Sequence, residues 1–455
     1  MSRRNRDMCS GPMLGNIIAF TIPVILTSIM QLLFNTADLV IVGRFCGSAS
    51  VGAVGATSSA TTLIFSLFLG LSVGASACAA QAIGAGDFDK TSRTVHTTIP
   101  TAILGGAGLA VIGNIVCEPL LTLMGTPENV LPLSTIYMRI YFAAMPFNML
   151  YNFGAALLRS AGDTKRPLIY VSISGVVNVL LNIVFVTVFH MDVAGVALAT
   201  TISIALSSLL VLRALMRRHD ALHFDFKEMC FDKDVLKKML SIGVPSGLQS
   251  SLFSISNILI QSSINSFGDI FLAGNSAAGN IEGYVYMAMT AFYHAALTFS
   301  GQNYGAKKFD RIKKSLFICA LCSGVVGIVL GNLAYLFGGK LLSIYITDSA
   351  QAISYGLMRM SIISVLYFLC GIMDTITGTI RGMGSSFTTM IITVFGTCVF
   401  RIAWIYTVFA IPSLHTPQCL FLSYPLSWTI TIIAELIAFA IIFKRKKKEA
   451  ELITE

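Results

Sequence analysis

Long apolar runs separated by short polar connections dominate the chain. Twelve such runs, each bounded by Gly, Pro or charged residues, cover approximately residues 16–42, 51–84, 95–118, 131–158, 167–190, 193–215, 236–266, 270–305, 315–338, 351–380, 387–411 and 418–443. A helix needs ~20 apolar residues to cross a bilayer at a rise of ~1.5 Å per residue, and every run is long enough. The pattern predicts an all-α polytopic membrane protein with twelve transmembrane helices.

The composition agrees with this prediction, and the distribution of the charged residues indicates how the chain is oriented in the membrane. Only 12% of the 455 residues are charged, 55% are hydrophobic and the formal net charge is +9. If the N-terminus is cytoplasmic, 26 of the 31 Lys and Arg residues fall on that side, and only Arg44 and Lys340 fall in outer loops. Cytoplasmic loops are rich in Lys and Arg. We therefore expect a multi-pass protein of the cell (inner or plasma) membrane with both termini cytoplasmic, and no nucleic-acid partner.

The beginning of the chain predicts a retained span. Arg3, Arg4 and Arg6 precede the run 16–42, which is longer than the core of a cleavable signal and is closed by no small-residue cleavage site.

The two halves of the chain repeat each other at an offset of 220 to 222 residues. Pro23 matches Pro245, Gly47 matches Gly268, and residues 81–89 match 302–310. Six runs precede the repeat, so both halves start on the same side and are related by a pseudo-two-fold axis along the membrane normal. The predicted domains are an N-terminal six-helix bundle (1–215), a cytoplasmic linker (216–235), a C-terminal six-helix bundle (236–443) and a basic tail (444–455).

Two such bundles are typical of an alternating-access carrier, whose ligand sites lie near the middle of the membrane. Pro23 and Pro245 fall early in the first span of each half. A proline removes a backbone donor and bends a helix, so each is interpreted either as a static kink or as a hinge.

Charged residues inside the spans are the best candidates for function, because an ionised side chain at bilayer depth costs ~2.5–3.5 kcal/mol. They are Asp38, Glu282, Asp374, Glu435, Arg139, Arg359 and Arg401. Arg139 and Arg359 lie close enough to the outer ends of their spans to reach the surface, and we interpret them as structural.

In the first half, one carboxylate and several amides fall at similar depths. Asp38 lies too deep for its short side chain to reach the headgroups, and Asn178 and Asn182 share one face of the fifth span. Asn35 lies one turn before Asp38. A carboxylate with amide oxygens can bind a proton or a dehydrated Na⁺. These four residues are the predicted ion-coupling site, and the alternative is a hydrogen-bonded helix-packing cluster.

In the second half, Glu282 and Asp374 lie inside spans eight and ten, and Arg401 could neutralise either acid. If Arg401 pairs with Asp374, Glu282 is the freer carboxylate for a cationic ligand or a proton. Tyr284 and neighbouring rings could offer aromatic faces to an organic cation or could simply pack. Glu435 in span twelve has no evident partner.

Several motifs resemble those of one family. They are Pro23 and Asp38 before the VGR of residues 42–44, the segment from Gln81 to Gly84, the LRSAGDTKRP loop of residues 158–167 and IRGMGSS from Ile380. Their order and spacing resemble the multidrug and toxic compound extrusion (MATE) family over nearly the whole chain.

The resemblance implies an efflux antiporter that exports cationic, often aromatic compounds in exchange for Na⁺ or H⁺. It implies that Asp38 is the coupling aspartate and Pro23 the first-helix bend. Asn178 matches a family asparagine, Asn182 stands where many bacterial members carry aspartate, and Asp374 matches an acid of the second bundle.

Other classes are less consistent with the sequence. A lipid-linked oligosaccharide flippase of the same superfamily and a passive channel stay as alternatives, as does a membrane-embedded enzyme. No catalytic or nucleotide-binding motif is found, so we expect no enzyme activity, no cofactor beyond the coupling ion, and an ion gradient as the energy source.

The partners expected are small organic cations and the lipid bilayer, and the protein is expected to be a monomer. Cys319 with Cys322, and His219 with His223, are interpreted as packing and loop residues rather than metal ligands.

Overall fold

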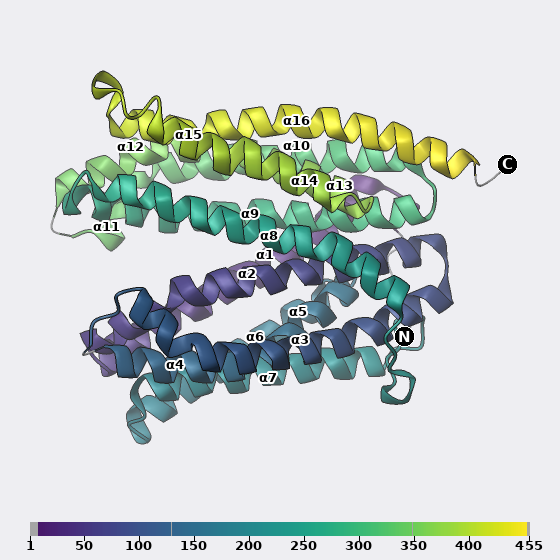
Figure 1. Ribbon diagram of the computed structural model, residues 1–455, viewed down its shortest axis with the longest axis horizontal. Coiled ribbons are helices and arrows are strands. Elements are labelled where there is room, and N and C mark those ends of the chain that lie inside the picture. The colour runs from purple at the N-terminus through teal and green to yellow at the C-terminus, as the bar shows by residue number, and fades with distance from the viewer. Residues whose placement is uncertain (1–7, 129, 348, 453–455) are drawn as a thin grey trace. The chain divides into compact units, whose positions relative to one another are not determined.

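The computed structural model describes residues 8–128, 130–347 and 349–452, and no strand occurs among them. Arg3, Arg4 and Arg6, and residues 453–455 of the expected tail, lie outside the described residues. The elements, drawn in Figure 1, are α1 (Met13–Phe45), α2 (Ser48–Ala85), α3 (Phe88–Leu123), α4 (Leu131–Ala143), α5 (Met145–Ser160), α6 (Lys165–Ile183), η1 (Val184–Val188), α7 (Asp192–Met216), η2 (Phe226–Glu228), α8 (Lys233–Asn265), α9 (Asp269–Gly305), α10 (Phe309–Leu336), α11 (Gly338–Tyr345), α12 (Ala350–Leu366), α13 (Phe368–Gly382), α14 (Ser386–Thr393), η3 (Val394–Val399), α15 (Phe400–Tyr406), η4 (Pro412–Leu414) and α16 (Pro417–Leu452).

These elements correspond to the twelve predicted spans, four of which are built from more than one piece. The fourth span is α4 followed by α5, where Pro146 lacks the donor that would continue the helical ladder. The fifth span is α6 continued by the π-helical stretch η1. The tenth is α12 followed by α13, which are bent by 42°. The eleventh contains the π-helical stretch η3 between α14 and α15. The short helix α11 was not predicted.

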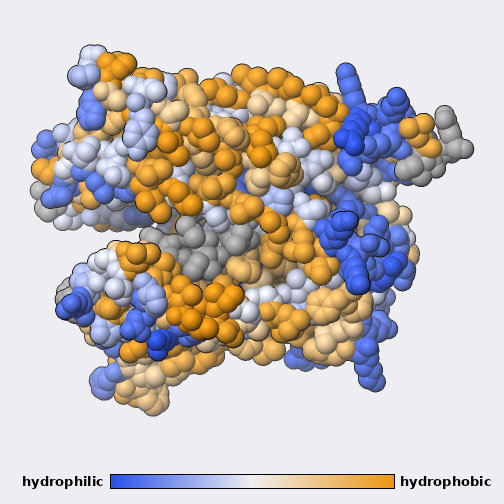
Figure 2. Space-filling view, viewed as in Figure 1, coloured by the Kyte–Doolittle hydropathy of each residue, from blue (hydrophilic) through white to orange (hydrophobic). Residues whose placement is uncertain are grey.

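The outer surfaces of many helices are apolar, as expected of lipid-facing residues. In the described part of the chain, eight helices are long and apolar enough to cross a membrane, and nine are if the bent pair α12 and α13 counts as one span. Large hydrophobic side chains on α3 and α10, such as Val111, Ile115, Leu321 and Val325, are more than half exposed. Figure 2 shows apolar side chains along the sides of the helices and hydrophilic ones gathered toward their ends. This distribution suits a multi-pass membrane protein.

The helices form two compact units, and each unit takes part of its first helix from the other half of the sequence. The first unit holds residues 26–247, and the second holds the described residues of 8–25 and 248–452. The division therefore falls inside α1 and α8, two residues after Pro23 and two after Pro245.

Packing explains why the first part of α1 belongs to the second unit and the first part of α8 belongs to the first unit. Ile17 and Phe20 of α1 are fully buried against Phe299 of α9 in the second unit. In the first unit, a Cβ added to Gly70 of α2 would lie 2.1 Å from the backbone nitrogen of Gly247 on α8. Only glycine permits so close a helix contact. The units thus differ from the predicted bundles 1–215 and 236–443, which placed each first helix wholly in its own half.

The expected linker and tail are more ordered than a simple connection. Leu222 and Phe224 are buried in the core of the first unit, and the backbone N–H of Asp225 donates to Nε2 of His96 on α3 at 3.0 Å. The tail continues α16 as far as Leu452. The linker is thus docked on the first unit.

Candidate functional site

In the first unit, four polar side chains from three helices form a connected cluster that we call the first-unit cluster. It comprises Asp38 on α1, Asn178 and Asn182 on α6, and Thr200 on α7. Asn182 donates through Nδ2 to Oδ1 of Asp38, and Thr200 donates to Oδ2 of Asp38 at 3.3 Å. Asn178 donates to Thr200 at 3.3 Å, and Asn182 also reaches Oδ1 of Asn178 at 3.4 Å. The cluster brings together three of the four predicted ion-coupling residues.

The local sequence explains why Asp38 reaches α6. Asn178 and Asn182 lie one helical turn apart and are both buried, so they face the interior together. One turn earlier, Gly175 leaves room for the ring of Phe34, which a Cβ at that position would approach to 1.8 Å. Phe34 lies one turn before Asp38. The glycine therefore allows α1 to pack closely on α6 and brings the carboxylate to the two amides.

The electrostatics of the first-unit cluster favour a cation. Among the described residues, no Lys, Arg or His nitrogen lies within 4.0 Å of Asp38, so the carboxylate has donors but no counter-charge. Oδ1 of Asn182 is buried and accepts no hydrogen bond in the described structure. A half-buried carboxylate with a free amide oxygen and a hydroxyl beside it provides oxygen ligands for a small cation, or a group that takes up a proton.

Asn35 and Thr200 show the limits of the sequence prediction here. Asn35 is exposed and makes no hydrogen bond to the other three predicted residues. Thr200 was not predicted, because a threonine in an apolar span usually bonds to its own helix and its partner depends on helix rotation. The π-helical stretch η1 begins two residues after Asn182, and such turns are frequent at functional sites.

In the second unit, the partner of Glu282 is Arg359. Nη2 and Nε of Arg359 donate to Oε2 of Glu282 at 2.6 and 3.1 Å, and Ser364 donates to Oε1 at 3.2 Å. Arg359 also donates to Asn275 at 2.6 Å. Glu282 is only 3% exposed. The prediction that Glu282 is the freer carboxylate is therefore wrong for this structure, since Arg359 points inward from α12 and neutralises it.

Arg401 pairs with no acid in the described structure. It is 2% exposed, its Nε donates to Ser427 at 2.9 Å, and Nη2 has no hydrogen-bond partner. Its guanidinium lies 4.1 Å from the ring centroid of Tyr424 and 5.7 Å from that of Trp428. Aromatic faces attract a cation, so these rings supply much of its stabilisation.

The remaining predicted residues of the second unit lie apart from these contacts. Asp374 on α13 interacts with the hydroxyl of Tyr286 and with the charge of Arg381. Tyr284 is half-buried and bonds to neither Glu282 nor Asp374 in the described structure. Pro23 and Pro245 are both buried, close to the points where the two units divide.

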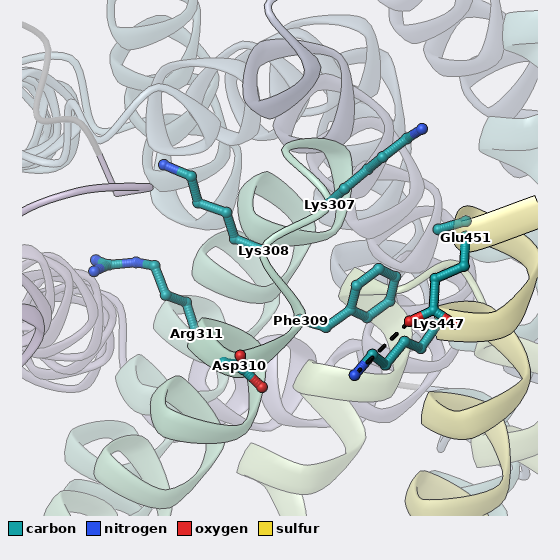
Figure 3. Close-up of a pocket in the computed structure, with 8 residues that line it drawn as sticks. Lys307, Lys308, Phe309, Asp310, Arg311, Lys447 and Glu451 are labelled. Carbon is teal, nitrogen blue, oxygen red and sulfur yellow. Dashed lines mark ion pairs between the residues drawn. The ribbon is translucent and has the colours of Figure 1, made fainter. Parts of the chain in front are cut away.

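The end of the second unit that carries its basic loops has a pocket of about 520 Å³. Figure 3 shows Lys307, Lys308 and Arg311 around it, with Lys447 paired to Glu451. None of the buried acids described above lines this pocket. We therefore assign it to the basic surface rather than to a transport site. In the described residues, no group of three His, Cys, Asp or Glu side chains could hold a metal ion.

Twelve apolar spans, with the acid Asp38 lying between helices without a counter-charge among the described residues, define a polytopic membrane protein of the class that includes secondary transporters. The chain belongs to the MatE family, whose model matches residues 23–184 and, separately, 245–407. The resemblance to the MATE family is thus confirmed, and the two separate matches coincide with the internal repeat.

Individual relatives cover most of the chain. A protein described as "Probable multidrug resistance protein YoeA" of Bacillus subtilis is 32% identical over 384 residues, covering 83% of this chain and 82% of its own. One described as "FAD transporter" of Shewanella oneidensis is 24% identical and covers 68% and 70%. A solved structure described as an outward-facing multidrug resistance MATE family transporter aligns with a TM-score of 0.90 at 20% identity, covering 98% of this chain and 100% of that one. The family and its fold are those of transporters rather than enzymes.

Proposed function

We propose that the protein is a secondary active multidrug efflux antiporter, which exports aromatic organic cations in exchange for Na⁺ or H⁺ by alternating access. The observation that carries the proposal is the first-unit cluster, in which the Asp38 carboxylate has no counter-charge among the described residues. We place the protein in the cell membrane with both termini in the cytoplasm, as a monomer without a cofactor beyond the coupling ion.

The coupling ion acts at Asp38 in this proposal. When Asp38 is ionised, the donors of Asn182 and Thr200 hold it; a bound proton or Na⁺ removes its negative charge and changes those hydrogen bonds. Helix α1 carries Asp38 in the first unit, and its first 13 residues pack in the second. Rearrangement around Asp38 is therefore transmitted along α1 through Pro23, which acts as a hinge because it weakens the helix there.

One observation favours a second candidate, an exporter of anionic aromatic compounds. Arg401 is a buried cation without an acidic partner and is surrounded by aromatic rings. A relative of similar length is described as an FAD transporter, and the FAD phosphates are anionic. The two candidates share the antiport cycle and differ in the charge of the substrate.

Transport in proteoliposomes tests both candidates. Cationic and anionic aromatic dyes of similar size are loaded, and either a Na⁺ gradient at constant pH or a pH gradient without Na⁺ is imposed. We expect one gradient to drive efflux of the cationic dye against its concentration and Asp38→Asn to abolish it. The matched control is Glu118→Gln, which removes an exposed acid paired with Arg139 at 3.2 Å and leaves efflux unchanged.

Three outcomes would overturn the proposal. They are wild-type efflux by the Asp38→Asn protein, movement only down the dye gradient, as in a channel, and efflux of the anionic dye alone, which would favour the second candidate.

A further inference from the structure

The second unit contains another buried carboxylate that the proposed cycle does not use. Glu435 on α16 is 0% exposed. Its Oε1 accepts hydrogen bonds from Thr377 on α13 at 2.6 Å and from Thr393 on α14 at 3.2 Å. Its Oε2 is buried and accepts no hydrogen bond in the described structure. We call Glu435, Thr377 and Thr393 the second-unit cluster.

The charge of Glu435 is not neutralised by a neighbouring base. Among the described residues, no Lys, Arg or His nitrogen lies within 4.0 Å of its carboxylate, in contrast to Glu282 with Arg359. The ionisable groups that act on it electrostatically are Asp374 and Arg381, both on α13. A carboxylate in this position is unfavourable unless it carries a proton or lies against a cation.

The geometry offers oxygen ligands in a group rather than a lone acid. Two hydroxyls and the free Oε2 come from three helices that meet at one point. The π-helical stretch η3 begins immediately after Thr393, and such turns are frequent at functional sites. A carboxylate and hydroxyls whose lone pairs can point inward suit a monovalent cation, because several protein oxygens must replace the water ligands that the cation loses.

The second-unit cluster is no copy of the first-unit cluster. At the repeat offset of 222 residues, Asp38 corresponds to Ile260 and Glu435 corresponds to Arg213. The two carboxylates therefore occupy unrelated positions of the repeat, and each unit has its own arrangement around one acid.

We propose that the second-unit cluster binds one monovalent cation, H⁺ or Na⁺, in addition to the ion at Asp38. The binding of this cation does not depend on the proposed antiport cycle. The coupling ratio does rest on the proposed function: each export event is then coupled to two cations rather than one.

Tryptophan fluorescence isolates this site, because both tryptophans of the chain, Trp404 and Trp428, lie in the second unit. Trp428 precedes Glu435 on α16 by about two helical turns. The purified Asp38→Asn protein, whose first-unit carboxylate is absent, is titrated with NaCl at fixed pH against choline chloride, and separately with acid without Na⁺. We expect one titration to give a saturable fluorescence change, and the active arm identifies the cation.

Substitutions then assign the signal to the second-unit cluster. Adding Glu435→Gln to Asp38→Asn should abolish the change. Thr377→Val, which keeps the side-chain shape and loses the hydroxyl, should weaken the apparent affinity by about tenfold, as expected for one lost ligand, and Thr377→Ser should not. Asp310→Asn, which removes an exposed acid of α10 in the same unit, is the matched acid control. A change that persists without Glu435, or that disappears with Asp310→Asn, would overturn the proposal.

The coupling ratio is measured by the accumulation of a cationic dye at static head. The membrane potential is clamped to zero, and the logarithm of the dye concentration ratio is plotted against the logarithm of the imposed ion concentration ratio. The slope should fall from about two in the wild type to about one in Glu435→Gln, because the ion gradient contributes once for each coupled ion. An unchanged slope would contradict coupling. Failure of the proposed function would appear differently, as no accumulation in the wild type with the fluorescence change retained.

Discussion

At the scale of single residues, the charged pair of Glu282 and Arg359 gives the clearest energetic expectation. The side chain of Glu282 is 3% exposed and that of Arg359 is 12% exposed, and the pair is extended by Asn275 and Ser364. Removing one member leaves the other as an uncompensated charge, which costs about 3–5 kcal/mol. We expect Glu282→Gln to lower the thermal unfolding midpoint in detergent strongly, and the double variant Glu282→Gln with Arg359→Met to recover part of the loss. A double variant less stable than Glu282→Gln alone would show that the charge is not the cause.

Thr200 supports a second prediction at this scale. It donates to Asp38 and accepts from Asn178, so it links the carboxylate to α6 through α7. Thr200→Val keeps the shape and removes both bonds, and we expect it to weaken coupling-ion affinity by about tenfold. Thr200→Ser is the matched control. The measurement is the ion concentration for half-maximal efflux in proteoliposomes, and equal values for both variants would exclude a role for the hydroxyl.

These residues show how far sequence reasoning reaches at a site. Asp38, Asn178 and Asn182 could be predicted because depth along a helix and shared faces follow from residue counting. Thr200 and the partner of Glu282 could not, because pairing between helices depends on their rotation, which counting does not supply. Arg359 in particular was interpreted as a structural residue within reach of the outer surface, and its side chain turns inward to Glu282.

At the scale of elements, most helices could be predicted from the apolar runs, but the sharing of α1 and α8 could not. A run of hydrophobic residues predicts that a span exists, but it does not predict which hydrophobic core the span packs in. The crossing depends on particular contacts, such as the approach of Gly70 to the backbone of α8. The breaks within the tenth and eleventh spans were missed for the same reason, since no proline marks them.

The beginning of α8 supports a prediction about pH. Asp232 precedes this helix, and the backbone N–H groups of Val235 and Asp234, together with Arg93, lower the pKa of its carboxyl. A carboxyl whose pKa is lower in the folded state stabilises the fold above its unfolded pKa of about 3.9 and loses that contribution as the pH falls through the folded value.

The variant Asp232→Asn keeps a helix-capping side chain but has no titratable charge. We therefore expect it to be less stable than the wild type at pH 7 and to approach wild-type stability below about pH 4. Thermal unfolding of the purified protein across this range is the measurement, with Asp89→Asn as an exposed control that also removes a carboxylate paired with Arg93. A difference between the two proteins that does not change with pH would contradict the electrostatic explanation.

At the scale of the whole molecule, the distribution of basic residues is the property that gives an orientation in the membrane. Lys and Arg cluster at the beginnings of α3 and α6, around the loop before α10 and at the end of α16, whereas the connections predicted to lie on the opposite side hold few. The positive-inside rule is statistical and acts during insertion. The proposed direction of export requires this orientation, so it needs a direct measurement.

Cysteine labelling gives that measurement, because no disulfide joins any of the ten cysteines in the described structure and all of them can be replaced. In a cysteine-free background, Lys340→Cys at an exposed position before α12 should react with a membrane-impermeant maleimide added to intact cells. Lys307→Cys, in the exposed loop before α10, should react only after the membrane is opened. The two positions bracket α10, so opposite accessibility is expected if that helix spans the membrane. The reverse pattern would invert the proposed topology and place the basic pocket outside the cell.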